Sequence, residues 1–125
     1  MSNLVDIEGV PVMDVWGDTV RARRIEGERI TLALVELAPD STVPGHRHEN
    51  EQLGMVITGA LTFTIEDETR ELGPGGTWRI PSNAYHQVSV GPEGAVVIDI
   101  FAPIRSDWDT LPTNAPTPPS WPNRP

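Results

Sequence analysis

The sequence predicts an all-β fold, a sandwich or a barrel built from short strands. Apolar or alternating segments of about five to eight residues recur along the chain, and glycine or proline separates them. No segment convincingly repeats apolar residues at the i, i+3, i+4 and i+7 positions of an amphipathic helix. With 125 residues, the chain is long enough for one domain with a single core.

The strand candidates follow one another with a turn signal after each. Two weaker candidates near the N-terminus are Pro11–Trp16 and Thr19–Ile25. Gly59 stands between two apolar segments and predicts a tight hairpin there, and the GPEG sequence at 91–94 predicts another turn. The stronger candidates are Arg29–Leu37, Gln52–Ile57, Ala60–Ile65, Thr69–Leu72, Trp78–Ile80, His86–Val90 and Ala95–Phe101.

The chain divides into three expected regions. Residues 1–28 would pack on the main domain or on a dimer partner, and residues 29–110 would form that domain. Residues 111–125 form a proline-rich extended tail that cannot join a central strand, because proline has no N–H to donate. The tail is either an arm lying on the domain or a disordered end, and Trp121 favours the arm.

Composition excludes several kinds of function. The absence of cysteine excludes disulfides, thiolate zinc sites and cysteine nucleophiles, and the absence of lysine excludes Schiff-base chemistry. A net charge of -9 argues against a nucleic-acid partner. The apolar runs are too short to cross a bilayer, and the N-terminus lacks the pattern of a signal peptide, so we expect a cytoplasmic protein without a membrane partner.

The histidines indicate a metal site. His46 and His48 are one residue apart, and on a strand both side chains would leave the same face, about 6–7 Å apart. Two imidazoles at that separation can bind one ion. Gln52 has the same parity, and His86 lies in a separate strand that antiparallel pairing could bring opposite the first two. Taken alone, a His-x-His pair on a strand is more often a polar pair at a barrel rim than a metal site.

The spacing of these residues resembles the cupin superfamily. Its first motif is usually a glycine, His-x-His, three or four residues, a glutamate, six residues and a glycine. His46, His48, Gln52 and Gly59 match the later part of this motif, with glutamine in place of glutamate and without the leading glycine.

The second cupin motif is usually a glycine, five residues, Pro-x-Gly, two residues and a histidine. Gly75, Pro81 and His86 match it, and Asn83 replaces the second glycine, which is acceptable because asparagine tolerates a left-handed backbone. The resemblance implies a conical double-stranded β-barrel with one divalent metal ion inside. Its implied ligands are His46, His48, Gln52 and His86.

The glutamine influences which chemistry the site would support. Glu49 and Glu51 are the alternatives for the carboxylate position, but their parity is opposite to that of the histidines, so we read both as solvated. The neutral amide of Gln52 leaves the full charge of the ion in place, which favours an anionic ligand and disfavours a trivalent metal. Zinc, nickel, iron, manganese or copper would suit such a site.

A second group of candidate residues follows in the segment AVVIDIFAPIR at 95–105. Asp99 is the single acid of an apolar strand and shares its face with Phe101. If that face points inward, burial raises the pKa of Asp99 and makes it a candidate for proton transfer; the alternative is a structural aspartate. Arg105 suits the capture of a carboxylate, or alternatively a surface ion pair with Asp107 or Asp109.

The segment from Asp99 to Trp108, together with the first motif, is similar to the KdgF-type cupins of pectin and alginate breakdown. Those proteins ketonise 4,5-unsaturated uronates. The resemblance implies a metal-dependent isomerase in which the metal and Arg105 bind the substrate carboxylate, Asp99 transfers a proton and Phe101 shapes the pocket.

Three alternatives remain open at the level of sequence. They are a metal-dependent dioxygenase, a polyketide-cyclase-like cupin and a non-catalytic small-molecule-binding cupin. In the cyclase, Tyr85, Trp78 and Phe63 could form an aromatic wall, and we count Tyr85 among the candidate substrate-binding residues. Strands that are apolar on both faces, such as RITLALVEL, lead us to expect a homodimer. The uncompensated charge of the metal ion leads us to expect a small anionic substrate.

Overall fold

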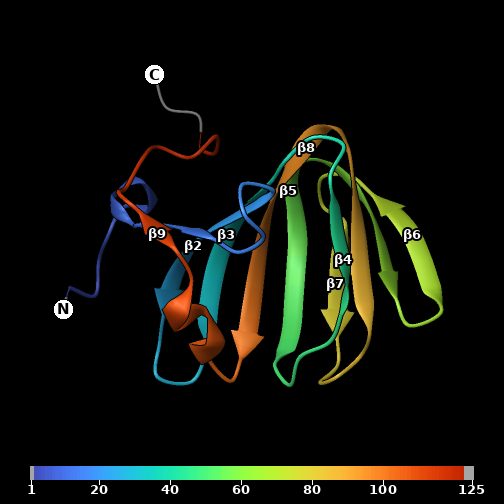
Figure 1. Ribbon diagram of the computed structural model, residues 1–125, viewed down its shortest axis with the longest axis horizontal. Helices are drawn as coiled ribbons and strands as arrows, with labels where there is room; N and C mark the ends of the chain where they lie inside the picture. Colours follow the sequence, from blue (N-terminus) through green and yellow to red (C-terminus); the bar gives the residue numbers. More distant parts are fainter. Residues whose placement is uncertain (1, 123–125) are drawn as a thin grey trace.

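Two long strands, β5 (Glu51–Ile65) and β8 (His86–Ala102), lie at the centre of the computed structural model, which describes residues 2–122 (Figure 1). They pair antiparallel along most of their length. The two 3-10 helices are η1 (Ile7–Gly9) and η2 (Ser106–Thr110). The shorter strands are β1 (Val12–Asp14), β2 (Val20–Glu26), β3 (Thr31–Leu37), β4 (Thr42–His46), β6 (Glu68–Leu72), β7 (Thr77–Ile80) and β9 (Thr113–Asn114).

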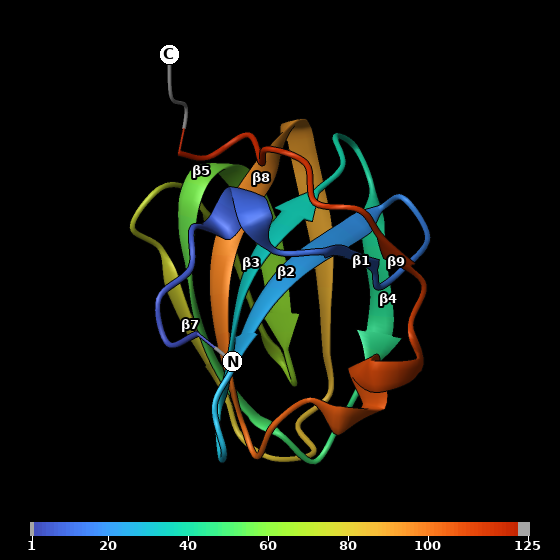
Figure 2. The ribbon, with the colours of Figure 1, turned by 90° about the vertical axis from the view of Figure 1, so that its left-hand side faces the viewer.

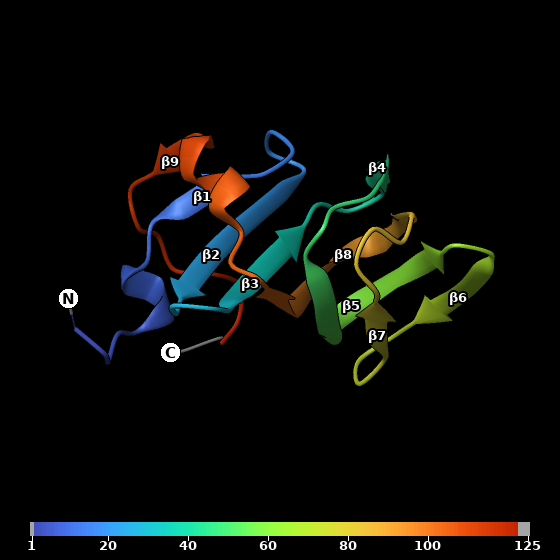
Figure 3. The same ribbon diagram turned by 90° about the horizontal axis from the view of Figure 1, so that it is seen from below.

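Each long strand contributes to two walls. The first half of β5 pairs with β7 and its second half with β6. The first half of β8 pairs with β4 and its second half with β3. One wall therefore runs β1-β2-β3-β8-β5-β7 and the other β4-β8-β5-β6, as the view from below in Figure 3 shows. This arrangement confirms the predicted all-β double-stranded barrel.

The prediction of turns at Gly59 and at 91–94 is wrong, because β5 continues through Gly59 and β8 continues through 91–94. The pairing register between the two strands shifts on either side of Gly59. Gly59 has φ 81° and Gly94 has φ 75°, and a Cβ on Gly59 would lie 2.0 Å from the carbonyl oxygen of Gly94. The glycines therefore allow the strands to cross closely from one wall to the other. From sequence, such a bulge gives the same signal as a hairpin.

The proline-rich tail, from residue 111 to residue 122, lies on the domain as an arm, and residues 123–125 lie outside the described part of the chain. β9 pairs with the edge strand β1, and Figure 2 shows the tail passing along this end of the barrel. Arg23 Nη2 donates a hydrogen bond to the carbonyl oxygen of Thr117 at 2.9 Å. Ser120 Oγ donates to Glu36 Oε2 at 2.8 Å. These bonds hold the tail against the outer face of β2 and β3.

The core between the walls is formed by alternate residues of each strand, as the period of two requires. Ala33, Val56, Ile80 and Val97 are almost fully buried there. In the described part of the chain, no helix is long and apolar enough to span a membrane.

Candidate metal centre

The three histidines converge at one end of the barrel. His46 ends β4 and is the cross-strand partner of His86, which begins β8. His48 lies two residues beyond the end of β4, so only His46 of the His-x-His pair is on a strand. The ring centroids of His46 and His86 are 4.3 Å apart, and those of His48 and His86 are 4.9 Å apart. One potential ligand atom from each ring lies within 4.8 Å of the other two.

Backbone carbonyls hold all three histidine rings in the same tautomer. Nδ1 lies 2.8 Å from the carbonyl oxygen of Pro44 in His46, 3.0 Å from that of Asn50 in His48, and 2.9 Å from that of Ala84 in His86. A carbonyl oxygen only accepts, so each Nδ1 carries a proton and each Nε2 of a neutral ring presents a lone pair. Histidine ligands of metals are usually oriented by such contacts.

Gln52 turns its carbonyl oxygen towards the histidines. Its Nε2 donates to Asp99 Oδ1 at 2.8 Å, and its Oε1 lies 3.2 Å from His48 Nε2. Because His48 already donates through Nδ1, two acceptors face each other unless the ring is positively charged. Burial and the positive charge of Arg105 lower the pKa of His48, which opposes that charged form. A cation between these atoms would satisfy both, so the residues fit the implied divalent metal ion.

His86 also favours the neutral, ligating form. Its side chain is 3 % exposed, and burial lowers its pKa to about 4, with the positive charges of His46, His48 and Arg105 acting in the same direction. At neutral pH the ring is therefore available as a ligand. Glu49 and Glu51, the alternatives for the carboxylate position, are both exposed.

Asp99 is a buried carboxylate held through one oxygen. Its Oδ1 accepts hydrogen bonds from Gln52 Nε2 at 2.8 Å and from Trp78 Nε1 at 2.9 Å. Burial raises the pKa of Asp99 to about 6, although both donors and the charge of Arg105 act in the opposite direction. A Cβ at Gly54 would lie 2.2 Å from Trp78 Nε1 and 2.5 Å from Asp99 Oδ1, so the glycine makes room for this contact.

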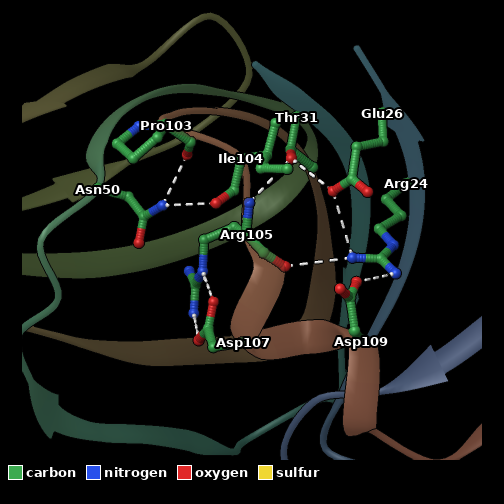
Figure 4. A network of polar contacts seen from close by, with 9 residues as sticks. All are labelled: Arg24, Glu26, Thr31, Asn50, Pro103, Ile104, Arg105, Asp107 and Asp109. Atoms are coloured by element: carbon green, nitrogen blue, oxygen red, sulfur yellow. Dashed lines mark hydrogen bonds and ion pairs between the residues drawn. The ribbon is translucent and has the colours of Figure 1, made fainter. Parts of the chain in front are cut away.

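Arg105 is fixed where β8 leads into η2 (Figure 4). The backbone N–H of Arg105 donates a hydrogen bond to Thr31 Oγ1 at 3.0 Å. Its guanidinium donates through Nε and Nη2 to Asp107 at 3.0 and 2.9 Å, and its Cζ lies 4.7 Å from the ring centroids of Phe101 and Trp108. The guanidinium thus makes the alternative ion pair with Asp107 and also lines the cavity.

A cavity of about 230 Å³ is lined by several of these residues, although His48 is not among them. His46, Gln52, His86, Asp99, Phe101 and Arg105 contribute to its lining. Tyr85 is not among the lining residues: its ring lies over Gly45, with the hydroxyl at the place where a Cβ of that glycine would be.

Among the polar and aromatic residues that line the cavity, three were not predicted as site residues, namely Trp16, Asp107 and Trp108. The ring centroid of Trp16 lies 5.8 Å from that of His46. Trp16 precedes β2 in a loop that carries no motif, so its sequence context gave no sign of the metal centre. Asp107 and Trp108 lie two and three positions after Arg105, and the sequence pattern around that arginine could have marked them as site residues.

Comparison with known proteins identifies the class. The model of the cupin domain family matches residues 33–101, and the chain belongs to this family. Within it, the chain is KdgF-like. It is 30% identical over 94 residues to the pectin degradation protein KdgF of Dickeya dadantii (strain 3937), covering 74% of this chain and 86% of that protein.

Solved structures show the same fold. KdgF from Halomonas sp. superposes with a TM-score of 0.77 at 24% identity, covering 86% of this chain and 98% of that one. An RmlC-like cupin from Shewanella frigidimarina NCIMB 400 gives a TM-score of 0.78 at 18% identity, covering 86% and 96%.

Proposed function

We propose that this cupin is a metal-dependent isomerase that ketonises a small unsaturated sugar acid, a 4,5-unsaturated uronate. The observation that carries the proposal is the position of Asp99. Its Oδ1 is held by Gln52 and Trp78, and Asp99 lines the same cavity as His46, His86 and Arg105. Similarity to a pectin degradation protein supports a uronate as the substrate.

The cationic groups would bind the acid. A divalent ion held by the three histidines and Gln52 would supply a positive charge that no carboxylate ligand reduces. Arg105 would bind the substrate carboxylate through its Nη1, which takes no part in the two hydrogen bonds to Asp107. The cation–π contacts with the rings of Phe101 and Trp108 keep the guanidinium in place while it does so.

Asp99 would move the proton. Opening of the sugar ring leaves an enol, and ketonisation transfers one proton from the enol oxygen to the neighbouring carbon of the double bond. The two donors engage Oδ1, so Oδ2 is the oxygen that can accept this proton and return it. The proton balance closes within the substrate, and the step requires no oxidant.

The test follows the ultraviolet absorbance of a 4,5-unsaturated uronate with metal-loaded protein. We expect the wild type to accelerate the loss of absorbance over the spontaneous reaction. Asp99→Asn should reduce the rate about 10²- to 10⁴-fold, the usual contribution of general acid–base catalysis, while metal content stays unchanged. Glu49→Gln, which removes an exposed carboxylate three positions before Gln52 in the sequence, is the matched control and should retain full activity.

Two results would contradict the proposal. One is a metal-loaded wild type that does not accelerate the reaction. The other is an Asp99→Asn variant that retains the wild-type rate. Binding of uronates without turnover would instead assign the cavity to a non-catalytic binding protein.

A further inference from the structure

Asn50 makes hydrogen bonds to two separate parts of the site. It follows the candidate ligand His48 by two positions and is only 5% exposed. Its backbone carbonyl oxygen lies 3.0 Å from His48 Nδ1 and accepts the proton of that nitrogen. Its side-chain Nδ2 donates to the carbonyl oxygens of Pro103 and Ile104, at 2.6 and 3.2 Å (Figure 4). One residue therefore contacts both a histidine of the metal centre and the segment that leads into Arg105.

The place of Asn50 follows from where the pairing of β5 with β8 ends. Glu51 and Ala102 form the last pair at this end of the two strands. The next residue, Pro103, has no N–H to donate, so the backbone pairing cannot continue in the same way. The amide of Asn50 has two N–H groups, one for each of the two carbonyl oxygens that it contacts. Its side chain thus attaches the two residues before Arg105 to the start of β5.

The backbone of Arg105 is held from the opposite side by β2 and β3. Its N–H donates to Thr31 Oγ1 at 3.0 Å, and its carbonyl oxygen accepts from Arg24 Nη1 at 3.2 Å. Of the three residues Arg24, Thr31 and Asn50, Asn50 is the one whose hydrogen bonds also reach a candidate metal ligand. A change at Asn50 would therefore affect the arginine and the histidine together.

We propose that Asn50 is a positioning residue that sets the place of Arg105 relative to His48, so that the metal ion and the arginine can bind one substrate carboxylate together. The part that concerns Arg105 rests on the proposed function, and the part that concerns His48 does not. The carbonyl of Asn50 keeps Nε2 of His48 available as a ligand. Its amide fixes the segment that carries the guanidinium, and two cationic groups hold one carboxylate only when their separation matches it.

A purely structural role for Asn50 is the competing explanation. Removing a buried amide leaves two carbonyl oxygens without a donor and lowers the stability of the protein in either case. A structural role would reduce the amount of folded protein and leave the metal affinity and KM of the folded molecules unchanged. A positioning role changes both quantities in molecules that are folded.

The first test measures the dissociation constant of Zn²⁺ in the absence of substrate, by competition with a chelator. For Asn50→Ala we expect it to rise about 10- to 100-fold, the usual effect of losing a partner that orients a ligand. Exchange of the Arg105 Nε proton with water, followed by NMR, should become faster, because its bond to Asp107 is held less firmly. Asn114→Ala is the matched control: it removes a side-chain amide that donates to the carbonyl oxygen of Val12, outside the metal centre, and should change neither quantity.

A double-mutant cycle connects Asn50 with Arg105 in the reaction. In metal-saturated protein, Asn50→Ala should raise KM for the unsaturated uronate about tenfold, because a charge-assisted hydrogen bond to the carboxylate is weakened. In an Arg105→Gln background the same replacement should change KM little, since the group that it displaces is already absent. Asn50→Gln retains both amide protons on a longer side chain and should recover part of the metal affinity and of KM.

Two results would overturn the proposal. One is an Asn50→Ala protein that is folded, as shown by urea unfolding, and has the metal affinity and proton exchange of the wild type. The other is a KM effect that is equally large in the Arg105→Gln background. If Asn50→Ala does not fold, Asn50→Gln supplies the same comparisons with smaller shifts. A wild type that binds Zn²⁺ without turning over the uronate overturns the proposed function alone, and metal affinity and proton exchange still decide the role of Asn50.

Discussion

Replacement of Gln52 by glutamate tests how the candidate ligand and Asp99 depend on each other. Gln52 Nε2 donates to Asp99 Oδ1 at 2.8 Å, and the Asp99 side chain is 7% exposed. Glutamate would place a second carboxylate oxygen at the position of this donor. Two buried carboxylates in such contact cannot both remain ionised, so the pair must retain one proton.

The loss of stability caused by retaining this proton depends on the pH. Burial raises the pKa of Asp99 to about 6, so above pH 6 the wild-type carboxyl is ionised and the variant pair still holds a proton. The unfolded variant has released its protons in this range, so the folded state binds more protons and loses stability as the pH rises. Each pH unit is worth about 1.4 kcal/mol for the variant, and the wild type itself loses only about 0.4 kcal/mol over this range. The destabilisation of Gln52→Glu relative to the wild type should therefore grow by about 2 kcal/mol between pH 6 and pH 8.

Urea unfolding of the metal-free protein at pH 6, 7 and 8, in the presence of a chelator, measures this difference. The double variant Gln52→Glu/Asp99→Asn has one carboxyl at the contact, as the wild type does, and should show nearly the wild-type pH dependence. The reasoning is refuted if Gln52→Glu is equally destabilised at pH 6 and pH 8, or if its steep pH dependence persists in the double variant.

Three further predictions concern single contacts. Trp78→Phe removes one donor to the Asp99 carboxylate and should lower the free energy of unfolding by about 1.5–3 kcal/mol and reduce kcat, with metal content unchanged; unchanged kcat would show that the indole is only structural. Gly54→Ala forces a Cβ into the same contact and should cost about 1–3 kcal/mol in thermal unfolding, whereas a neutral effect would contradict the observed crowding. Ser120→Ala removes a donor that helps to lower the pKa of Glu36, so it should cost about 0.5–1.5 kcal/mol at pH 7 and progressively less as acid protonates the carboxyl; an effect that persists once the carboxyl is protonated would exclude this explanation.

The sequence predicted most of what depends on local spacing. The alternation of apolar residues indicated strands, and the two cupin motifs brought the three histidines and Gln52 to one site. Asn83 has φ 64°, in agreement with the left-handed backbone expected where the motif usually has glycine. Such features were accessible because they depend on the conformation of a few neighbouring residues.

Other features depend on contacts between distant segments, and the sequence either did not predict them or predicted them wrongly. Gly59 looked like the centre of a hairpin, because a tight turn and a crossing of two strands both require a residue without a side chain. Trp16 reaches the cavity from a loop without any motif, and the ring of Tyr85, a candidate substrate-binding residue, lies over Gly45.

The sequence by itself determined the class of fold, the kind of ligand atoms and the charge of the site, because composition and periodicity are properties of the chain alone. Only the tertiary structure decided which atoms face each other. The amide of Gln52 is oriented by Asp99, and Asp99 is held by Trp78 from another strand. The pKa of Asp99 likewise depends on how deeply the folded barrel buries it. Hydrogen-bond geometry and burial arise only when strands that are far apart in the chain pack together.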